Sequence, residues 1–215
     1  MKHPQCNFIA HCMGKFILWV TGWQVEGCVP PTRKMVIIAA PHTSNWDLLY
    51  LLGAAYSLRL SIFWLAKDSL FPPIIGQILR LFGGIPVDRS KRNNAVTKLV
   101  TRFTQQDELA IVIPPSGTRK HTKFWHSGFY QIAKGARVHM VCGFLDYERK
   151  VAGLGPAFVP GDDVSLDMNR IREFYKSIQA RYPEKTSRIV LKQESSTEGQ
   201  ASRFPNQGVD NENSS

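Results

Sequence analysis

The feature that most constrains the fold of this chain is an alternation of short apolar runs with segments of helical periodicity. The run Met35–Ile38 is rich in apolar and β-branched residues, as is typical of a buried strand. Pro41 ends that strand, because proline has no backbone N–H to donate. A mostly apolar helix is then expected over residues 45–58. The order recurs downstream, so we predict an α/β fold: a central, largely parallel sheet flanked by helices.

The remaining elements follow from the same patterns. We expect strands at 62–66, 85–87, 109–113 and 138–144, and helices at 74–81, 93–106 and 128–136. Residues 151–159 contain two glycines and a proline, which indicates an irregular edge strand. Apolar residues from Met168 to Ile178 form a last amphipathic helix, which ends before Pro183.

Three regions differ in composition. Within residues 1–30, the stretch 8–29 mixes aromatic and aliphatic residues with Lys15, which suits either a helix in a membrane interface or a first core helix. Residues 31–191 are expected to form the globular domain. Residues 192–215 have few apolar side chains, so we predict a disordered tail. No segment is long and apolar enough to predict a membrane span, and no signal peptide is recognised.

The charge is strongly positive and unevenly distributed. The formal net charge is +10, but the tail from Lys192 has two basic and four acidic residues, so residues 1–191 carry +12. A body of this charge favours anionic partners, such as phospholipid head groups or phosphorylated metabolites. The four cysteines show no metal-site spacing, and we expect them to be reduced thiols. No nucleic-acid-binding motif is present, and nucleic acid is not an expected partner.

A histidine and an aspartate lie in the turn between the first strand of the sheet and its helix. His42 and Asp47 are five residues apart, which allows the carboxylate to contact one imidazole nitrogen and leaves the other free for a substrate. This is the arrangement of a general base with an orienting partner. The alternative is that Asp47 caps the first amides of the helix and His42 is an ordinary turn residue.

Polar residues follow the predicted strands in a regular way. The strand ends carry His42, then Lys67, then Asp88-Arg89, and then the run Ser116-Gly117-Thr118-Arg119. Ligands of open α/β sheets collect at the carboxyl ends of the strands, and arginine and lysine bind phosphate there. Taken singly, Lys67, Arg89 and Arg119 are equally consistent with solvated or salt-bridged surface residues. Together they predict a site for a phosphate-bearing substrate.

The ordered motifs resemble those of the glycerolipid acyltransferases of the lysophosphatidic acid acyltransferase (PlsC-like) family. His42 to Asp47 matches the H-x4-D motif of that family. Gly84 to Arg89 is similar to its G-x-x-x-D-R block, and Gly117-Thr118-Arg119 matches its G-T-R motif. The resemblance covers roughly residues 35–160. One departure is Ser116, which stands where the family has glutamate.

The resemblance implies transfer of a fatty acyl group from acyl-CoA or acyl carrier protein to the hydroxyl of a lysophospholipid such as 1-acyl-glycerol-3-phosphate. His42 is then the general base and Asp47 its partner. Lys67, Arg89, Ser116, Gly117, Thr118 and Arg119 form the substrate site. Neither a metal nor a further cofactor is implied, and the protein is expected on the cytoplasmic side of a membrane, peripheral or monotopic.

Ser116 leaves an alternative function open. Loss of the glutamate places the usual acceptor in question and is compatible with a catalytically weak, membrane-associated lipid-binding relative. A serine nucleophile at this position is not supported, because the sequence lacks a G-x-S-x-G elbow.

Overall fold

The computed structural model describes residues 6–87, 92–192 and 194. Its helices are α1 (Phe8–Thr21), α2 (Trp46–Ser57), α3 (Pro73–Leu81), α4 (Arg92–Gln105), α5 (Gly128–Ala136) and α6 (Val164–Tyr175), with two short 3-10 turns at Asp68–Leu70 and Pro183–Lys185. Its strands are β1 (Gln24–Glu26), β2 (Lys34–Ala40), β3 (Phe63–Lys67), β4 (Gly84–Val87), β5 (Leu109–Ile113), β6 (His139–Asp146) and β7 (Val151–Phe158).

The strands form one seven-stranded sheet in the order β1-β7-β6-β2-β5-β3-β4. Strands β6, β2, β5, β3 and β4 are parallel to one another, whereas β7 runs antiparallel to β6 and β1 is parallel to β7. The predicted α/β fold with a largely parallel sheet is therefore confirmed.

Two expectations at one end of this sheet were wrong. Strand β7 is not an edge strand, because β1 pairs with its outer side, and the predicted helical stretch 8–29 ends at Thr21. Glycine explains the pairing: a Cβ at Gly153 would collide with the Glu26 carbonyl, and one at Gly27 with the Leu154 carbonyl. Gly153, one of the two glycines that make β7 look irregular in sequence, is therefore what lets β1 approach it, whereas Gly155 faces the Phe174 ring.

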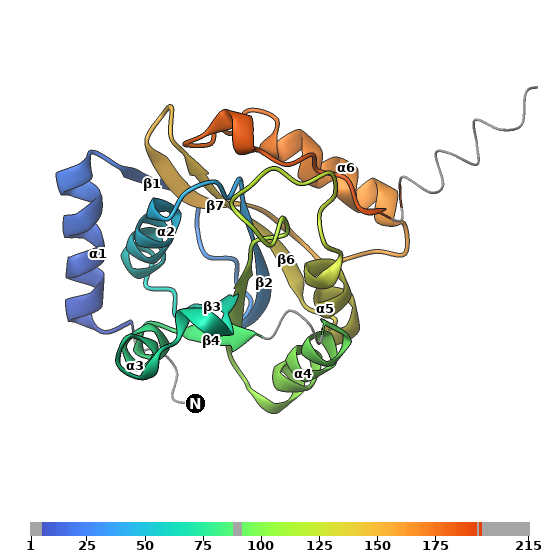
Figure 1. Ribbon diagram of the computed structural model, residues 1–215, viewed down its shortest axis with the longest axis horizontal. Coiled ribbons are helices and arrows are strands. Elements are labelled where there is room, and N and C mark those ends of the chain that lie inside the picture. Colours follow the sequence, from blue (N-terminus) through green and yellow to red (C-terminus); the bar gives the residue numbers. More distant parts are fainter. Residues whose placement is uncertain (1–5, 88–91, 193, 195–215) are drawn as a thin grey trace, which may run out of the picture.

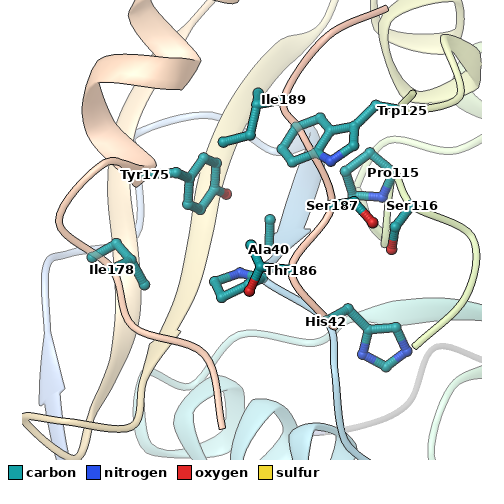
Figure 2. Close-up of a pocket in the computed structure, with 11 residues that line it drawn as sticks. Ala40, His42, Pro115, Ser116, Trp125, Tyr175, Ile178, Thr186, Ser187 and Ile189 are labelled. Carbon is teal, nitrogen blue, oxygen red and sulfur yellow. The ribbon is translucent and has the colours of Figure 1, made fainter. Parts of the chain in front are cut away.

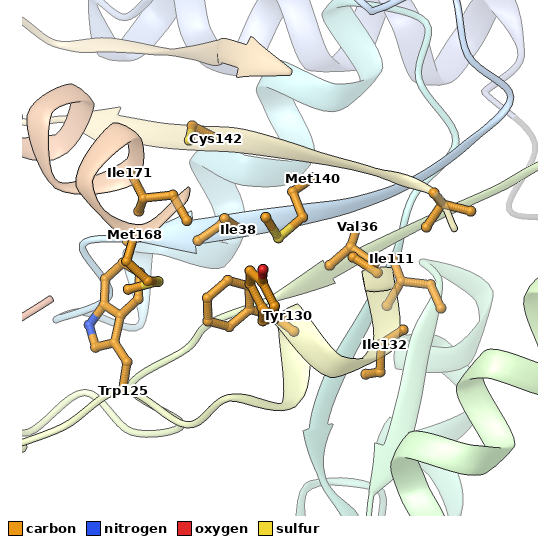
Figure 3. Packing of buried hydrophobic residues seen from close by; sticks show 14 of the residues in the cluster. Val36, Ile38, Ile111, Trp125, Tyr130, Ile132, Met140, Cys142, Met168 and Ile171 are labelled. Carbon is orange, nitrogen blue, oxygen red and sulfur yellow. The ribbon is translucent and has the colours of Figure 1, made fainter. Parts of the chain in front are cut away.

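Helices cover both faces of the sheet, with α1, α2 and α3 on one side and α4, α5 and α6 on the other (Figure 1). Alternate residues of β2 point to opposite faces, as in any strand. Val36 and Ile38 join the larger core, where Met140 and Cys142 of β6 meet Trp125, Tyr130, Ile132, Met168 and Ile171 (Figure 3). Met35 and Ile37 face α2 instead.

Helix α1 packs against α2 through glycine and leaves its other side exposed. A Cβ at Gly14 would lie 2.7 Å from the Gly53 carbonyl oxygen, so the two backbones are close enough to require glycine. The opposite side of α1 and the outer side of α3 are apolar but exposed, at Phe8, Ile9, Met13, Phe16, Trp19 and Val20 on α1 and at Ile74, Ile75, Ile78 and Leu81 on α3. We call these ten residues the apolar surface. The core interpretation of α1 is thus correct for the side that packs on α2, and the membrane interpretation of the exposed side stays a prediction.

Within the described residues, no helix combines the length and the apolar character that crossing a bilayer requires. The predicted tail, apart from Lys192 and Glu194, lies outside the described residues.

Candidate active site

The site is built on the turn between β2 and α2. Strand β2 ends at Ala40, and Pro41 and His42 follow at the carboxyl end of the sheet. The imidazole Nδ1 of His42 lies 3.0 Å from Oδ2 of Asp47 on the first turn of α2. The His42 side chain is 27% exposed and the Asp47 side chain 6% exposed, so the imidazole faces outward from a buried carboxylate.

The Asp47 carboxylate is held by four groups. Its Oδ2 accepts hydrogen bonds from the backbone N–H groups of Thr43 (2.9 Å) and Ser44 (3.0 Å) as well as contacting His42. Its Oδ1 accepts one from the Tyr147 hydroxyl at 2.6 Å. Burial by itself would raise the pKa of Asp47, but the hydrogen bonds from His42, Tyr147 and Ser44 outweigh it and lower that pKa. The carboxylate therefore remains ionised, and the His42 Nδ1–H donates to it.

The capping alternative is correct only in part. Asp47 does accept backbone hydrogen bonds, but from Thr43 and Ser44, which precede the helix. The first helical amide, that of Trp46, donates to the Ser44 hydroxyl instead. One carboxylate thus fixes the turn and contacts the imidazole.

Most of the predicted site residues line one cavity of about 320 Å³. His42, Asp47, Lys67, Gly117, Thr118 and Arg119 lie around it, and the two cations among them are exposed. The rest of the wall is largely apolar, with Leu48, Leu51, Trp64, Val112 and Leu145 reaching in from α2 and the sheet. Arg89 lies outside the described residues. The cavity thus combines an apolar interior with a histidine and cations.

Ser116 is placed differently from its neighbours in sequence. It is buried, its hydroxyl donates to the Thr118 carbonyl at 2.8 Å, and Gly117 takes the positive φ of +65° that this turn requires. Ser116 lines a second, smaller hollow of about 40 Å³, which it shares with His42, Trp125, Thr186 and Ser187 (Figure 2). His42 therefore stands between two hollows, and Ser116 belongs to the smaller one.

The sequence interpretation missed two parts of the site. Tyr147 follows β6, whose carboxyl end lies at the same edge of the sheet as that of β2. The segment 176–191 returns across the strand ends. There the Tyr182 amide donates to the Thr43 hydroxyl, and the Ser187 hydroxyl accepts hydrogen bonds from the amide and the hydroxyl of Thr122. Tyr147 could have been found from the sequence, because it comes just after a predicted strand, as the other site residues do. The segment 176–191 could not, because it has no periodic pattern.

The residues from 6 to 87, from 92 to 192 and 194 contain no group of three or more histidine, cysteine or acidic side chains placed to hold a metal ion. Cys6, Cys12, Cys28 and Cys142 are free thiols.

Comparison with known proteins agrees with the motifs and the fold. The family model described as "Acyltransferase" matches residues 23–143. A 1-acyl-sn-glycerol-3-phosphate acyltransferase of Streptococcus pneumoniae is 28% identical over 114 residues, which is 53% of this chain and 42% of the relative. The enzyme of that name from Limnanthes alba is 25% identical over 116 residues, again 53% of this chain and 41% of the relative. The match with these curated relatives thus spans about two fifths of their length.

A solved structure has the same fold. The 1-acyl-sn-glycerophosphate (LPA) acyltransferase PlsC from Thermotoga maritima superposes with a TM-score of 0.53 at 15% identity, over 78% of this chain and 74% of that one. Strand β2, the His42–Asp47 turn, strand β3 with Lys67 and the loop after β5 with Arg119 all fall within the region that the family model matches. The chain belongs to the acyltransferase family.

Proposed function

We propose that the protein transfers a fatty acyl group from a thioester donor to the hydroxyl of a lysophospholipid. The observation that carries this proposal is the Asp47 carboxylate paired with the imidazole of His42 at a cavity that is apolar inside and bears Lys67 and Arg119. An acyl chain suits the apolar wall and a phosphate suits the two cations. The names of the curated relatives point to the same class of reaction.

The mechanism follows from the two nitrogens of His42. Nδ1–H donates to Asp47, so Nε2 is the basic nitrogen that takes the proton of the acceptor hydroxyl. The acceptor oxygen attacks the thioester carbonyl carbon, the carbon–sulfur bond breaks, and the imidazolium returns the proton to the leaving thiolate. The products are a diacyl lipid and the free thiol of coenzyme A or acyl carrier protein. Asp47 stabilises the imidazolium that exists between the two proton transfers.

The two cations support a binding position for the phosphate of the acceptor. Arg119 presents a planar guanidinium for two-point contact with phosphate, and Lys67 adds a point charge on the neighbouring strand. Arg89, which the D-R motif assigns to the same role, belongs to this proposal by sequence alone. Gly117 and Thr118 bring backbone and hydroxyl groups to the same wall.

A direct assay tests the proposal. Purified protein is incubated with radiolabelled acyl-CoA or acyl carrier protein and a panel of lysophospholipids, and the diacyl product is counted. We expect product with at least one acceptor. A folded protein that binds lysophospholipid but forms no product with any donor would instead be the lipid-binding relative.

The apolar surface of α1 and α3 is the proposed membrane contact. Trp19 is 76% exposed and Ile74 78% exposed, and side chains of this kind on interfacial helices enter the region between head groups and acyl chains. The positive body favours an anionic leaflet such as the inner face of the plasma membrane. Both features support a peripheral position, next to the bilayer that would hold the acceptor.

Charge and apolar contact can be separated by a vesicle test. We expect the protein to float with vesicles of anionic phospholipid and to stay bound in salt of about 0.5 M. At that ionic strength, interactions between exposed charges are screened within a few ångströms. The double variant Trp19→Glu/Ile74→Glu should lose at least about tenfold in vesicle affinity, because each substitution replaces apolar contact with charge. Release of the unsubstituted protein by salt alone would show that the apolar surface does not insert.

Position 116 is expected to influence acceptor choice. A glutamate there would fill the small hollow beside His42 and add a carboxylate that accepts hydrogen bonds from the glycerol part of an acceptor. We expect Ser116→Glu to shift the ratio of rates toward lysophosphatidate by about tenfold, since a hydrogen bond to a charged group is worth ~1.5 kcal/mol or more. Ser116→Gln, of the same size without the charge, is the control. Equal acceptor ratios in all three proteins would show that position 116 does not select the acceptor.

A further inference from the structure

The Tyr147 hydroxyl is a partner of the active-site pair that neither the motifs nor the comparisons assign. It donates to Oδ1 of Asp47 at 2.6 Å, across 100 residues of sequence. We propose that Tyr147 is a positioning residue, which fixes the plane of the Asp47 carboxylate and through it the orientation of the His42 imidazole. The expected effect on kcat rests on the proposed function, but the orientation of the His42 imidazole can be tested without turnover.

The argument begins with how the two carboxylate oxygens are shared. Oδ2 meets His42, Thr43 and Ser44, three groups from the same short turn. Among the described residues Oδ1 has one donor, Tyr147. Contacts at Oδ2 alone leave the carboxylate free to rotate about that oxygen, whereas a donor at Oδ1 fixes its plane. The contacts at Oδ1 and Oδ2 together therefore fix the direction of the hydrogen bond between Asp47 and Nδ1 of His42.

Tyr147 is itself held rigidly enough for this role. Its ring meets Trp23 edge-on at 4.9 Å and Tyr50 edge-on at 5.9 Å, and Trp23 and Tyr50 are stacked at 4.2 Å. Its backbone amide donates to the Gln179 carbonyl at 2.9 Å, and the Arg181 guanidinium lies 5.8 Å from its ring centre. The phenol thus takes its position from the region before β1, from α2 and from the segment after α6.

The chemistry of the phenol suits a permanent donor. Burial, followed by the hydrogen bond to Asp47, raises the pKa of Tyr147 well above its ordinary value, so the hydroxyl keeps its proton. Tyr147 is also not among the described residues that line either hollow beside His42. It therefore acts on the reaction through Asp47 and not by touching a substrate.

The kinetic test uses a matched pair of variants. We expect Tyr147→Phe to lower kcat about tenfold, which corresponds to ~1.4 kcal/mol, and to leave KM for donor and acceptor within about twofold. Tyr50→Phe removes a hydroxyl from the same ring cluster without removing a bond to Asp47, and should keep kcat within about twofold of the unsubstituted protein. Equal losses in the two variants would overturn the proposal, because they would indicate a general effect on packing.

A double-variant comparison tests whether Tyr147 acts through Asp47. In an Asp47→Asn background the charged acceptor is gone, so adding Tyr147→Phe should cost less than about twofold. A full tenfold further loss in that background would show that Tyr147 acts by another route.

A measurement without turnover separates this inference from the proposed function. In histidine-labelled protein, the Nδ1 proton of His42 is identified by its loss in His42→Gln and its exchange with water is followed by NMR. We expect exchange about tenfold faster in Tyr147→Phe than in Tyr50→Phe. If neither the unsubstituted protein nor any variant transfers acyl groups, the proposed function fails, but the exchange rate of the Nδ1 proton still tests whether Tyr147 positions Asp47. Unchanged exchange in Tyr147→Phe would overturn the positioning role.

Discussion

Substitution of His42 by glutamine is expected to lower acyl transfer by about 10²- to 10⁴-fold, the usual contribution of a general base. Glutamine keeps a polar group of similar reach but cannot take a proton at neutral pH. The fold should be little affected, because the His42 side chain is 27% exposed and its hydrogen bond is to the turn-bound Asp47. The measurement is kcat/KM with the best acceptor of the panel, alongside the thermal unfolding midpoint.

Asp47→Asn provides the graded counterpart. Asparagine can still accept hydrogen bonds from Thr43 and Ser44, so the turn is expected to persist, but the charge that stabilises the imidazolium is lost. We expect a smaller loss than in His42→Gln, and nearly no further loss when both are combined, since the two residues act as a unit. Turnover of His42→Gln close to that of the unsubstituted protein would exclude the general-base mechanism.

The sheet was largely predictable because local pattern and tertiary position agree there. The β-branched run Met35–Ile38 became the middle of β2, and Leu109–Ile113 became β5 with its predicted bounds. Buried parallel strands are continuous apolar runs that polar loops do not imitate. The pattern failed at the other end of the sheet, where β1 has three residues and no apolar run. The pairing of β1 depends on a close backbone contact at Gly153, and the periodicity of a sequence does not reveal such tertiary contacts.

The site was predictable to the extent that strand ends share an edge. That rule placed Lys67, Thr118 and Arg119 around the same cavity as His42. It did not give side-chain direction, and for this reason Ser116 was grouped with neighbours whose hollow it does not line. The turn at Gly117, with its positive φ, lies between Ser116, which lines the smaller hollow, and Thr118, which lines the larger cavity.

In the proposed acyl transfer, the dependence of the rate on acyl-chain length is expected to involve Leu51. This side chain of α2 lines the 320 Å³ cavity and also the neighbouring hollow of about 20 Å³, so it stands where the two adjoin. We expect Leu51→Trp to fill the part of the cavity that adjoins this hollow. A chain that loses contact for three or four methylenes forfeits ~0.8 kcal/mol for each, or about 2–3 kcal/mol in all. That is about a 100-fold loss in kcat/KM.

The loss should be confined to long donors, because a short acyl chain never reaches the position of residue 51. A series of acyl donors of increasing length, assayed with one acceptor, gives the profile for each variant. Leu49→Trp is the control: Leu49 is a half-buried neighbour on α2 that lines neither of these two hollows. Overpacking can cost ~1–3 kcal/mol of stability, so unfolding midpoints are compared as well. A Leu51→Trp profile that runs parallel to that of the unsubstituted protein would show that the acyl chain binds elsewhere, and the apolar cavity would then need another occupant.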